Sequence, residues 1–208
     1  MKAPIPIYLA VEDELSEWVA RRALSTRPTP GYAIGAVFSQ GGSGYLKKQA
    51  PAFNNAAKGC PFLLLTDLDR CPCPPKLIED WLGRPKHPHL LLRVAVREVE
   101  SWLLGDSAGF SAFLGLRTKF ALGNPEHLPD PKQKLLKLAI NSPRRFIRES
   151  LAWKDESSGR IFQGPDYNAT LAKFVTTAWN LTKARKKCRS FDRLFLALER
   201  IESEFAAK

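Results

Sequence analysis

Four short and nearly continuous apolar runs constrain the fold of this chain more than any other feature. They lie at residues 5–11, 32–38, 61–67 and 89–96, and segments with helical periodicity separate them. Strands buried on both faces of a sheet have this unbroken apolar character, and their alternation with helices is typical of parallel sheets. We therefore expect an α/β fold with a mainly parallel sheet and helices on both faces.

The intervening segments carry recognisable helix boundaries. Residues 12–24 have acids in their first turn, which suits the helix dipole. The sequence GGSG at residues 41–44 predicts a loop, and the helix after it is expected to break near Pro51. A further helix begins at the Pro74–Pro75 pair and ends at Gly83.

The strand signal ends after the helix expected at residues 97–106. The rest of the chain contains four helical patterns, at residues 130–140, 143–153, 167–179 and 190–205. We expect two parts, an α/β domain over residues 1–106 and a basic helical extension over residues 107–208 that packs on it. The five tryptophans mostly fall on apolar helix faces and are expected in the core, with base stacking by one of them as the alternative.

Composition places the chain among soluble globular proteins. It has 208 residues, of which 44% are hydrophobic and 25% are charged. No apolar run reaches the roughly 20 residues of a membrane helix, and the acids near the N-terminus do not fit a secretory signal. Four cysteines, with Cys71 and Cys73 in a C-x-C pair, match neither a disulfide framework nor zinc-ligand spacing. These features predict a cytoplasmic protein without a membrane segment.

Positive charge is concentrated in the second half of the sequence. The net charge is +11, and three basic runs lie between residues 117 and 193. This excess favours a polyanionic partner, and nucleic acid is the common one, although a solvated helix face explains any single run equally well. The residues expected to contact nucleic acid are Lys47, Lys48, Arg144, Arg145, Lys183, Arg185, Lys186 and Lys187.

Carboxylates follow three of the apolar runs. Glu12 follows the first run, Asp67 and Asp69 end the third, and Glu98 and Glu100 follow the fourth. Because the carboxyl ends of parallel strands meet at one edge, these side chains are expected to converge there. On an extended chain, residues two apart point to the same side, which would align Asp67 with Asp69.

Carboxylates so close together repel one another, and a hard cation would relieve that repulsion. Oxygen ligands without His or Cys select Mg²⁺ or Mn²⁺. Such ions would activate water for phosphodiester hydrolysis while the basic half holds the polyanion. The neighbouring acids Asp13, Glu14 and Glu17 are interpreted as helix-start residues, with Glu17 as a reserve ligand.

These residues carry a family resemblance. IYLAVE followed by a helix, and then FLLLTDLD, resemble the Toprim domain of topoisomerases, primases and OLD-type (overcoming lysogenization defect) nucleases. VREVESWLLGD resembles the segment after the next strand in OLD-type Toprim domains. GPDYNATLAKFVTTAW is similar to small standalone Toprim-like bacterial proteins, which are often encoded beside an ABC/SMC-type ATPase.

The resemblance implies an Mg²⁺- or Mn²⁺-dependent endonuclease that cleaves DNA or RNA. Glu12 would be a metal ligand or general acid/base, Asp67 and Asp69 metal ligands, Glu100 a further ligand and Glu98 the second choice for that position. It also implies a place in a bacterial anti-phage or genome-maintenance system with an ATPase partner. One position departs from the family, since Toprim domains usually have glycine where this chain has Asp13.

Two other functions fit parts of the pattern. In a glycosyl- or nucleotidyltransferase, the D-x-D of Asp67 and Asp69 would hold a nucleotide diphosphate through Mn²⁺, but Glu12 would have no role. In a non-catalytic adaptor or nucleic-acid-binding subunit, the acids would form salt bridges to the basic half. The chain has no G-x-S-x-G and no dinucleotide fingerprint, which disfavours acyl-transfer and redox chemistry.

Overall fold

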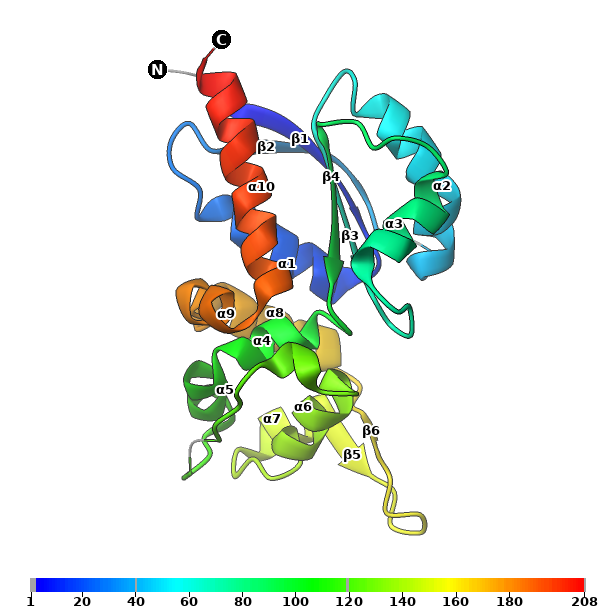
Figure 1. Cartoon of the computed structure of the whole chain (residues 1–208). Coiled ribbons are helices and arrows are strands. Elements are labelled where there is room, and N and C mark those ends of the chain that lie inside the picture. The colour runs from blue at the N-terminus through cyan, green and yellow to red at the C-terminus, as the bar shows by residue number, and fades with distance from the viewer. Residues whose placement is uncertain (1–2, 40, 119, 208) are drawn as a thin grey trace. The chain divides into compact units, whose positions relative to one another are not determined.

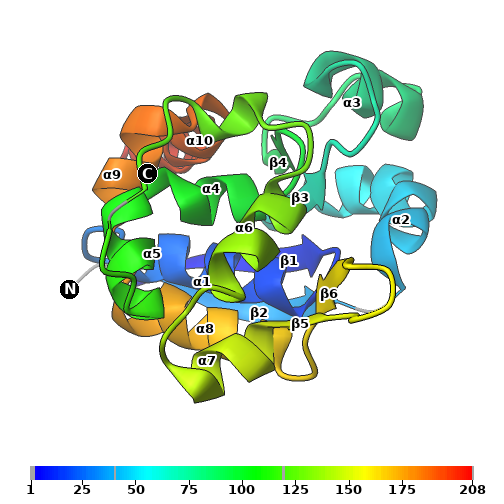
Figure 2. The same ribbon diagram turned by 90° about the horizontal axis from the view of Figure 1, so that it is seen from below.

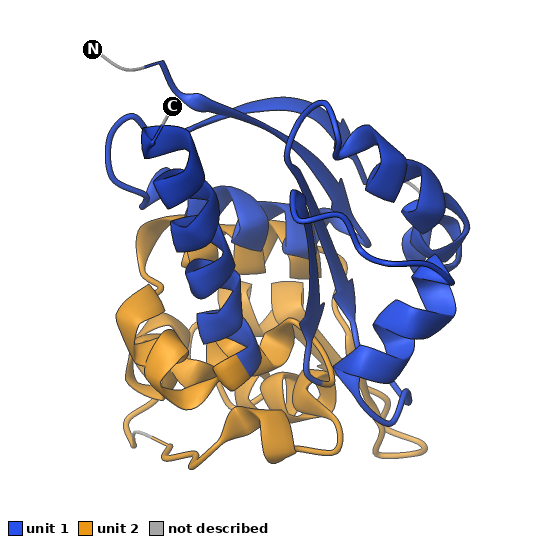
Figure 3. Cartoon of the chain, turned by 45° about the horizontal axis from the view of Figure 1, so that its top comes forward, with its two compact units in different colours: residues 1–96, 190–208 blue, residues 97–189 orange. Residues whose placement is uncertain are grey.

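A computed structural model describes residues 3–39, 41–118 and 120–207 of the chain. The chain forms two compact units. The first contains Met1–Val96 and Ser190–Lys208, and the second contains Arg97–Arg189 (Figure 3).

A four-stranded sheet organises the first unit. Its strands are β1 (Ile5–Val11), β2 (Tyr32–Phe38), β3 (Phe62–Asp67) and β4 (Leu90–Ala95). They pair in the order β2-β1-β3-β4, and every pair is parallel. The predicted α/β class and parallel sheet are confirmed.

Helices cover both faces of this sheet (Figure 1). The helices α1 (Glu14–Ser25) and α10 (Arg189–Ala206) lie on one face, and α2 (Gly42–Ala56) and α3 (Pro74–Leu82) lie on the other. Helix α3 has proline in its first turn and ends at Gly83, whose φ of 57° is the left-handed conformation that favours glycine.

Alternate residues of β3 fill the core on the two faces. Phe62 and Leu64 pack in the cluster that contains Leu46 of α2 and Leu77 of α3. Leu63, between them in sequence, is fully buried and faces the opposite side of the sheet. A strand buried on both faces must be apolar throughout, which explains the unbroken run in the sequence.

Helix α10 belongs to the first unit, although it comes last in the sequence. The hydroxyl of Tyr32 on β2 donates to the carbonyl of Leu198 at 3.1 Å, and the backbone N–H of Val96 donates to Oγ of Ser190 at 3.2 Å. The division of the chain therefore differs from the expected boundary at residue 106. The sequence did not indicate this arrangement, because the apolar face of a helix shows that the helix is packed but not which element it packs against.

The second unit is mainly helical. Its elements are α4 (Glu100–Gly105), α5 (Ser107–Leu114), the 3₁₀ turn η1 (Pro125–His127), α6 (Pro131–Ala139), α7 (Arg145–Leu151), β5 (Ala152–Lys154), β6 (Ile161–Gln163), α8 (Tyr167–Thr177) and α9 (Leu181–Lys187). Trp102, Phe110 and Phe174 are fully buried in it. The antiparallel β5–β6 hairpin corrects the expectation of a purely helical segment after residue 107.

Helix α2 corrects two further expectations. The predicted loop at residues 41–44 is already helical from Gly42, and the helix continues through Pro51 instead of breaking there. Proline removes one helical hydrogen bond, but the helix buries Leu46, Ala50 and Phe53 against the sheet, and this burial holds it together.

Within the described residues, no helix is long and apolar enough to cross a membrane.

Candidate active site at the carboxyl edge of the sheet

Glu12 lies where the order of the strands reverses. Val11 at the end of β1 pairs with Leu65 of β3, so Glu12 follows directly at the carboxyl edge of the two central strands. The chain leaves β1 toward β2 on one side and leaves β3 toward β4 on the other. In open α/β sheets, ligands bind at such a switch point.

The first unit holds the Glu12 carboxylate by two hydrogen bonds from the end of β3. The Thr66 hydroxyl donates to it at 2.9 Å, and the backbone N–H of Asp67 donates at 3.2 Å. Burial raises the pKa of Glu12, these two bonds oppose the rise, and the nearby negative charges of Asp69 and Asp13 add to it. The carboxyl group is therefore fixed in place and its pKa is shifted toward neutrality.

Asp67 and Asp69 do not lie on one extended chain. Strand β3 ends at Asp67, the next residue Leu68 is buried, and Asp69 has a φ of 49° within a turn. The Leu68 N–H still bonds to the carbonyl of Ala95 at the end of β4, and the turn is closed by the bond from Cys71 N–H to the carbonyl of Leu68, both 2.9 Å long. Aspartate tolerates this left-handed conformation better than most residues do. Asp67 is half-buried and Asp69 is exposed.

Asp13 caps helix α1. Its backbone is extended, and its carboxylate accepts a 2.8 Å hydrogen bond from the N–H of Ser16. Glycine could adopt the same backbone but would leave that N–H without a side-chain acceptor. Glu17, the reserve ligand, forms an ion pair with Arg21 at 2.8 Å. The interpretation of Asp13 as a helix-start residue is confirmed.

A pocket of about 320 Å³ opens beside the two aspartates. Asp67 and Asp69 line it together with Lys47 from α2 and Trp81 from α3. Lys47 is thus next to the acids, whereas Lys48 is exposed and does not line the pocket.

Gly41 makes the turn into α2 with a φ of 98°, and a Cβ there would lie 2.6 Å from Cβ of Tyr45.

Glu98 and Glu100 lie in the second unit. Glu100 is only 5% exposed, and the Tyr167 hydroxyl donates a 2.7 Å hydrogen bond to its carboxylate. Burial raises the pKa of Glu100 to about 7, despite the opposing effects of Tyr167 and Lys132. The carboxylate of Glu98 accepts a hydrogen bond of 2.8 Å from the backbone N–H of Lys132. Both acids thus have contacts inside their own unit, which the sequence did not indicate.

The oxygen donors suit a hard divalent cation, although they do not form a closed cage. Across the part of the chain that the structure describes, no three His, Cys, Asp or Glu side chains lie close enough to hold a metal ion together. Mg²⁺ is usually held by one or two carboxylates, with water and substrate phosphate completing its coordination. A site with one or two carboxylates is compatible with the residues around Glu12. The charge of Asp69 is near enough to raise the pKa of Glu12, and the N–H of Asp67 bonds to the Glu12 carboxylate.

Several basic residues expected at nucleic acid make contacts inside the second unit. Arg144 donates to the carbonyl of Phe113 at 2.8 Å, and Lys187 donates to the carbonyl of Leu122 at 3.0 Å. Others form ion pairs, Arg145 with Glu149 at 2.8 Å and Lys183 with Asp106 at 3.8 Å. On helix α9, which also carries Lys183 and Lys187, Lys186 is exposed and Arg185 is half-buried. All of these residues keep their positive charge, but the side chains of Arg144 and Lys187 also stabilise the fold through their bonds to backbone carbonyls.

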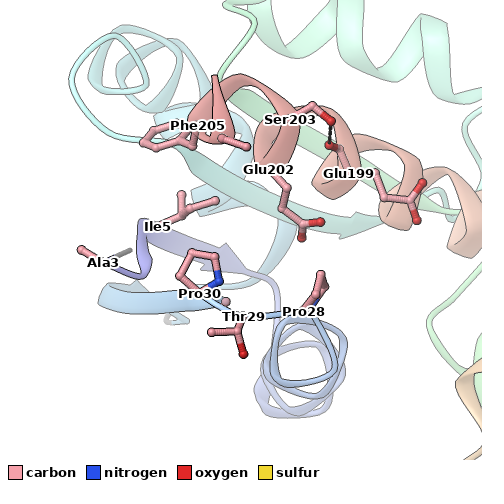
Figure 4. Close-up of a pocket in the computed structure, with 11 residues that line it drawn as sticks. Ala3, Ile5, Pro28, Thr29, Pro30, Glu199, Glu202, Ser203 and Phe205 are labelled. Carbon is pink, nitrogen blue, oxygen red and sulfur yellow. Dashed lines mark hydrogen bonds between the residues drawn. The ribbon is translucent and has the colours of Figure 1, made fainter. Parts of the chain in front are cut away.

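A second and larger pocket, of about 600 Å³, is not lined by Glu12, Asp67 or Asp69. Figure 4 shows the residues that line it. Ile5 at the start of β1, Pro30 and Phe205 of α10 line it. The only carboxylates on its described wall are Glu199 and Glu202, and Glu202 is bonded to Arg27 at 2.7 and 2.8 Å. Because Ile5 is the first residue of β1, this pocket lies at the amino edge of the sheet, opposite the edge where catalytic groups are expected.

Sequence reasoning missed the two residues that hold the buried carboxyl groups. Thr66 is the one polar residue inside the apolar run, and its position just before Asp67 was the available signal. Tyr167 stands in the GPDYN segment, 67 residues from its partner Glu100. Only the folded chain reveals such a pairing.

Comparison with known proteins places the chain in one family. No curated protein and no solved structure matches it. Residues 9–199 match the family model described as a domain of unknown function, DUF4276. The match begins within β1 and ends within α10, so it includes Glu12, both aspartates and the whole second unit. The chain belongs to the DUF4276 family.

Proposed function

We propose that this protein is a divalent-metal-dependent endonuclease of the Toprim type that hydrolyses phosphodiester bonds in DNA or RNA. The observation that carries the proposal is the position of Glu12, which lies at the switch point of a parallel sheet and is held by Thr66 and the backbone of Asp67. The resemblance of IYLAVE and FLLLTDLD to Toprim motifs supports it independently.

The residues of the chain divide the work in this proposal. Of Glu12, Asp67 and Asp69, one or two carboxylates at a time would hold Mg²⁺ or Mn²⁺, with water and substrate phosphate as the remaining ligands, since no three such side chains in the described residues lie close enough to hold one ion together. The bound ion would supply charge neutralisation at the phosphate and activation of water. Glu12 is suited to proton transfer, because burial raises its pKa toward the pH at which the enzyme would work. Lys47 lines the same pocket as the aspartates and would attract the phosphate backbone.

The same proposal includes the biological setting implied by the resemblance. The protein would work in the cytoplasm, with nucleic acid as substrate and an ABC/SMC-type ATPase as partner, in anti-phage defence or genome maintenance. The carboxylates of Glu98 and Glu100 already accept hydrogen bonds inside the second unit, from the N–H of Lys132 and the hydroxyl of Tyr167. They are therefore secondary ligands in the proposal.

Cleavage of plasmid DNA and of single-stranded RNA, each with Mg²⁺ or Mn²⁺, tests the proposal. We expect Glu12→Gln and Asp67→Asn to reduce cleavage roughly 100-fold or more, as loss of a general acid/base or metal ligand does. Glu79→Gln and Asp80→Asn are matched controls, because both acids are exposed on α3 and do not line the aspartate pocket. EDTA should abolish cleavage by the wild type.

Two outcomes would contradict the proposal. If Glu12→Gln and Asp67→Asn cleave as fast as the wild type, the site is elsewhere. If the wild type neither cleaves nor binds Mn²⁺ by titration calorimetry, with or without an ATPase partner, the protein is a non-catalytic subunit.

A further inference from the structure

An aromatic pair lies exposed on the hairpin of the second unit. Trp153 of β5 is 50% exposed and Phe162 of β6 is 40% exposed. The two residues are cross-strand neighbours, and their rings stack with centroids 4.8 Å apart and planes 22° from parallel. Large aromatic side chains usually lie in a core, so a stacked pair in water indicates a contact surface.

The fold of the hairpin holds this pair on one face. Ala152, the neighbour of Trp153, points to the opposite face and is buried. Helix α6 anchors that side, since Nε2 of Gln133 donates to the carbonyl of Ile161 at 3.3 Å. At the base, a Cβ on Gly164 would lie 2.4 Å from the carbonyl oxygen of Ser150, so only glycine allows this close approach. The aromatic face is therefore preorganised. Figure 2 shows the hairpin beside α7.

The tip of the hairpin is also ordered. The carboxylate of Asp155 accepts hydrogen bonds from the hydroxyls of Ser157 and Ser158 at 2.8 and 2.7 Å. The backbone N–H of Asp155 donates to the carbonyl of Arg160 at 2.9 Å. This last bond extends the strand pairing by one step beyond Lys154. Arg160 therefore projects on the same face as Phe162, two residues away, and it is exposed.

The unit that carries the aromatic pair is positively charged overall. Residues 97–189 contain 17 Lys and Arg against 9 Asp and Glu, which is a net charge of +8 out of the total of +11. On the hairpin itself, Arg160 is exposed on the aromatic face, whereas Lys154 lies on the face of Ala152 and the acids Asp155 and Glu156 lie at the tip. A stacked aromatic platform next to an arginine, in a unit with excess positive charge, suits a ligand with flat apolar groups and regular negative charge, which is a description of single-stranded nucleic acid.

We infer that the β5–β6 hairpin binds single-stranded nucleic acid, with a base stacked on Trp153 or Phe162 and a phosphate at Arg160. Bases in a duplex stack on one another and do not present their faces, so the platform selects single strands. The inference rests on the proposed function in taking nucleic acid as the substrate, and it adds which form of nucleic acid is bound and where.

Binding of fluorescein-labelled oligothymidylate to the full chain in EDTA tests the inference without cleavage. We expect Trp153→Ala to weaken binding roughly tenfold, the effect of losing one base-stacking contact, and Trp153→Phe to retain most of the affinity. Leu196→Ala is the matched control, because Leu196 is an apolar side chain 53% exposed on α10 in the other unit. Arg160→Gln should lower the slope of log affinity against log salt concentration by about one.

Intrinsic fluorescence gives a second readout that does not depend on a truncated side chain. Trp153 is exposed to solvent, whereas Trp102 and Trp179 are buried and Trp18 and Trp81 are partly buried. Saturating oligothymidylate should quench the wild-type emission, and Trp153→Phe should lose that quenching while still binding.

The inference is overturned if Trp153→Ala and the wild type bind oligothymidylate equally, or if a duplex binds as tightly and responds equally to Trp153→Ala. It is also overturned if saturating oligothymidylate leaves the wild-type tryptophan emission unchanged. Failure of the proposed function is separate, because oligothymidylate binding is measured in EDTA, where no metal-dependent cleavage occurs, and its outcome does not depend on whether the protein cleaves with Mg²⁺ or Mn²⁺.

Discussion

The hydroxyl of Thr66 donates a 2.9 Å hydrogen bond to the carboxylate of Glu12, joining the ends of the two central strands. Thr66 is fully buried and Glu12 is partly buried. This bond and the N–H of Asp67 offset part of the cost of keeping a carboxylate at a position that water reaches poorly.

Thr66→Val should raise the pKa of Glu12 further, because the hydroxyl that lowers it is removed. In the proposed endonuclease, we expect the acidic limb of the cleavage pH profile to move to higher pH, and we expect the free energy of unfolding to fall by about 1–3 kcal/mol. Thr66→Ser keeps the hydroxyl and serves as the control, with a pH profile like that of the wild type. Identical profiles for Thr66→Val and Thr66→Ser would show that the bond does not act on Glu12.

Asp13→Ala should destabilise the first unit by about 1 kcal/mol, the usual cost of losing a helix N-cap. Asp13→Asn should retain the stability, since asparagine also caps helices, and it should lower the pKa of Glu12 by removing one negative charge. Urea denaturation and the cleavage pH profile measure the two effects separately. Loss of all activity in a stable Asp13→Asn would mean that Asp13 acts in catalysis and not as a cap.

Glu100 should make the stability of the protein depend on pH between about 4.5 and 7. Its pKa is 4.5 when unfolded and about 7 in the native state, so the native state binds the proton more tightly. The contribution of Glu100 is complete below pH 4.5 and is lost as the pH rises through 7. Glu100→Gln keeps an oxygen for the Tyr167 hydroxyl but cannot ionise, so its unfolding free energy should fall less than the wild type's over this interval.

This comparison is made by chemical denaturation at several pH values in EDTA. Glu149→Gln is the control, because Glu149 is 58% exposed and its ion pair with Arg145 lies at the surface. Parallel pH profiles for the wild type and Glu100→Gln would contradict the prediction.

Glu202→Gln should destabilise the first unit by about 2 kcal/mol, because two charge-assisted hydrogen bonds to Arg27 are lost or weakened. The two side chains are only 10% and 19% exposed, so water does not replace the contact well. Asp80→Asn removes an exposed ion pair with Lys76 and should change stability by less than about 0.5 kcal/mol. Equal effects in thermal denaturation would show that α10 is not held to the first unit by Arg27.

Much of the first unit was predictable from local patterns. The four apolar runs coincide with β1 to β4. For β1, β3 and β4 the reason is burial on both faces of the sheet, whereas the edge strand β2 has no buried residue although it is apolar. Once the strands were parallel, Glu12 and Asp67 had to end at the same edge. The cap at Asp13 followed from the same local rules.

The β5–β6 hairpin was not predictable in that way. Its strands have three residues each, too few to show alternation, and Trp153 lies at the end of a pattern that reads as a helix. The continuation of α2 through Pro51 was equally hidden, because propensity favours a break and only burial against the sheet opposes it.

Local patterns in the chain were sufficient to predict the parallel sheet, the edge at which Glu12 and Asp67 lie and the excess of positive charge, because periodicity, strand direction and composition are local or additive properties. Tertiary structure alone decided that Thr66 and Asp67 hold Glu12, that Tyr167 meets Glu100 inside the second unit, that α10 returns to the first unit and that Trp153 faces solvent. These outcomes depend on contacts between residues far apart in the chain, and such contacts are set by the packing of whole elements.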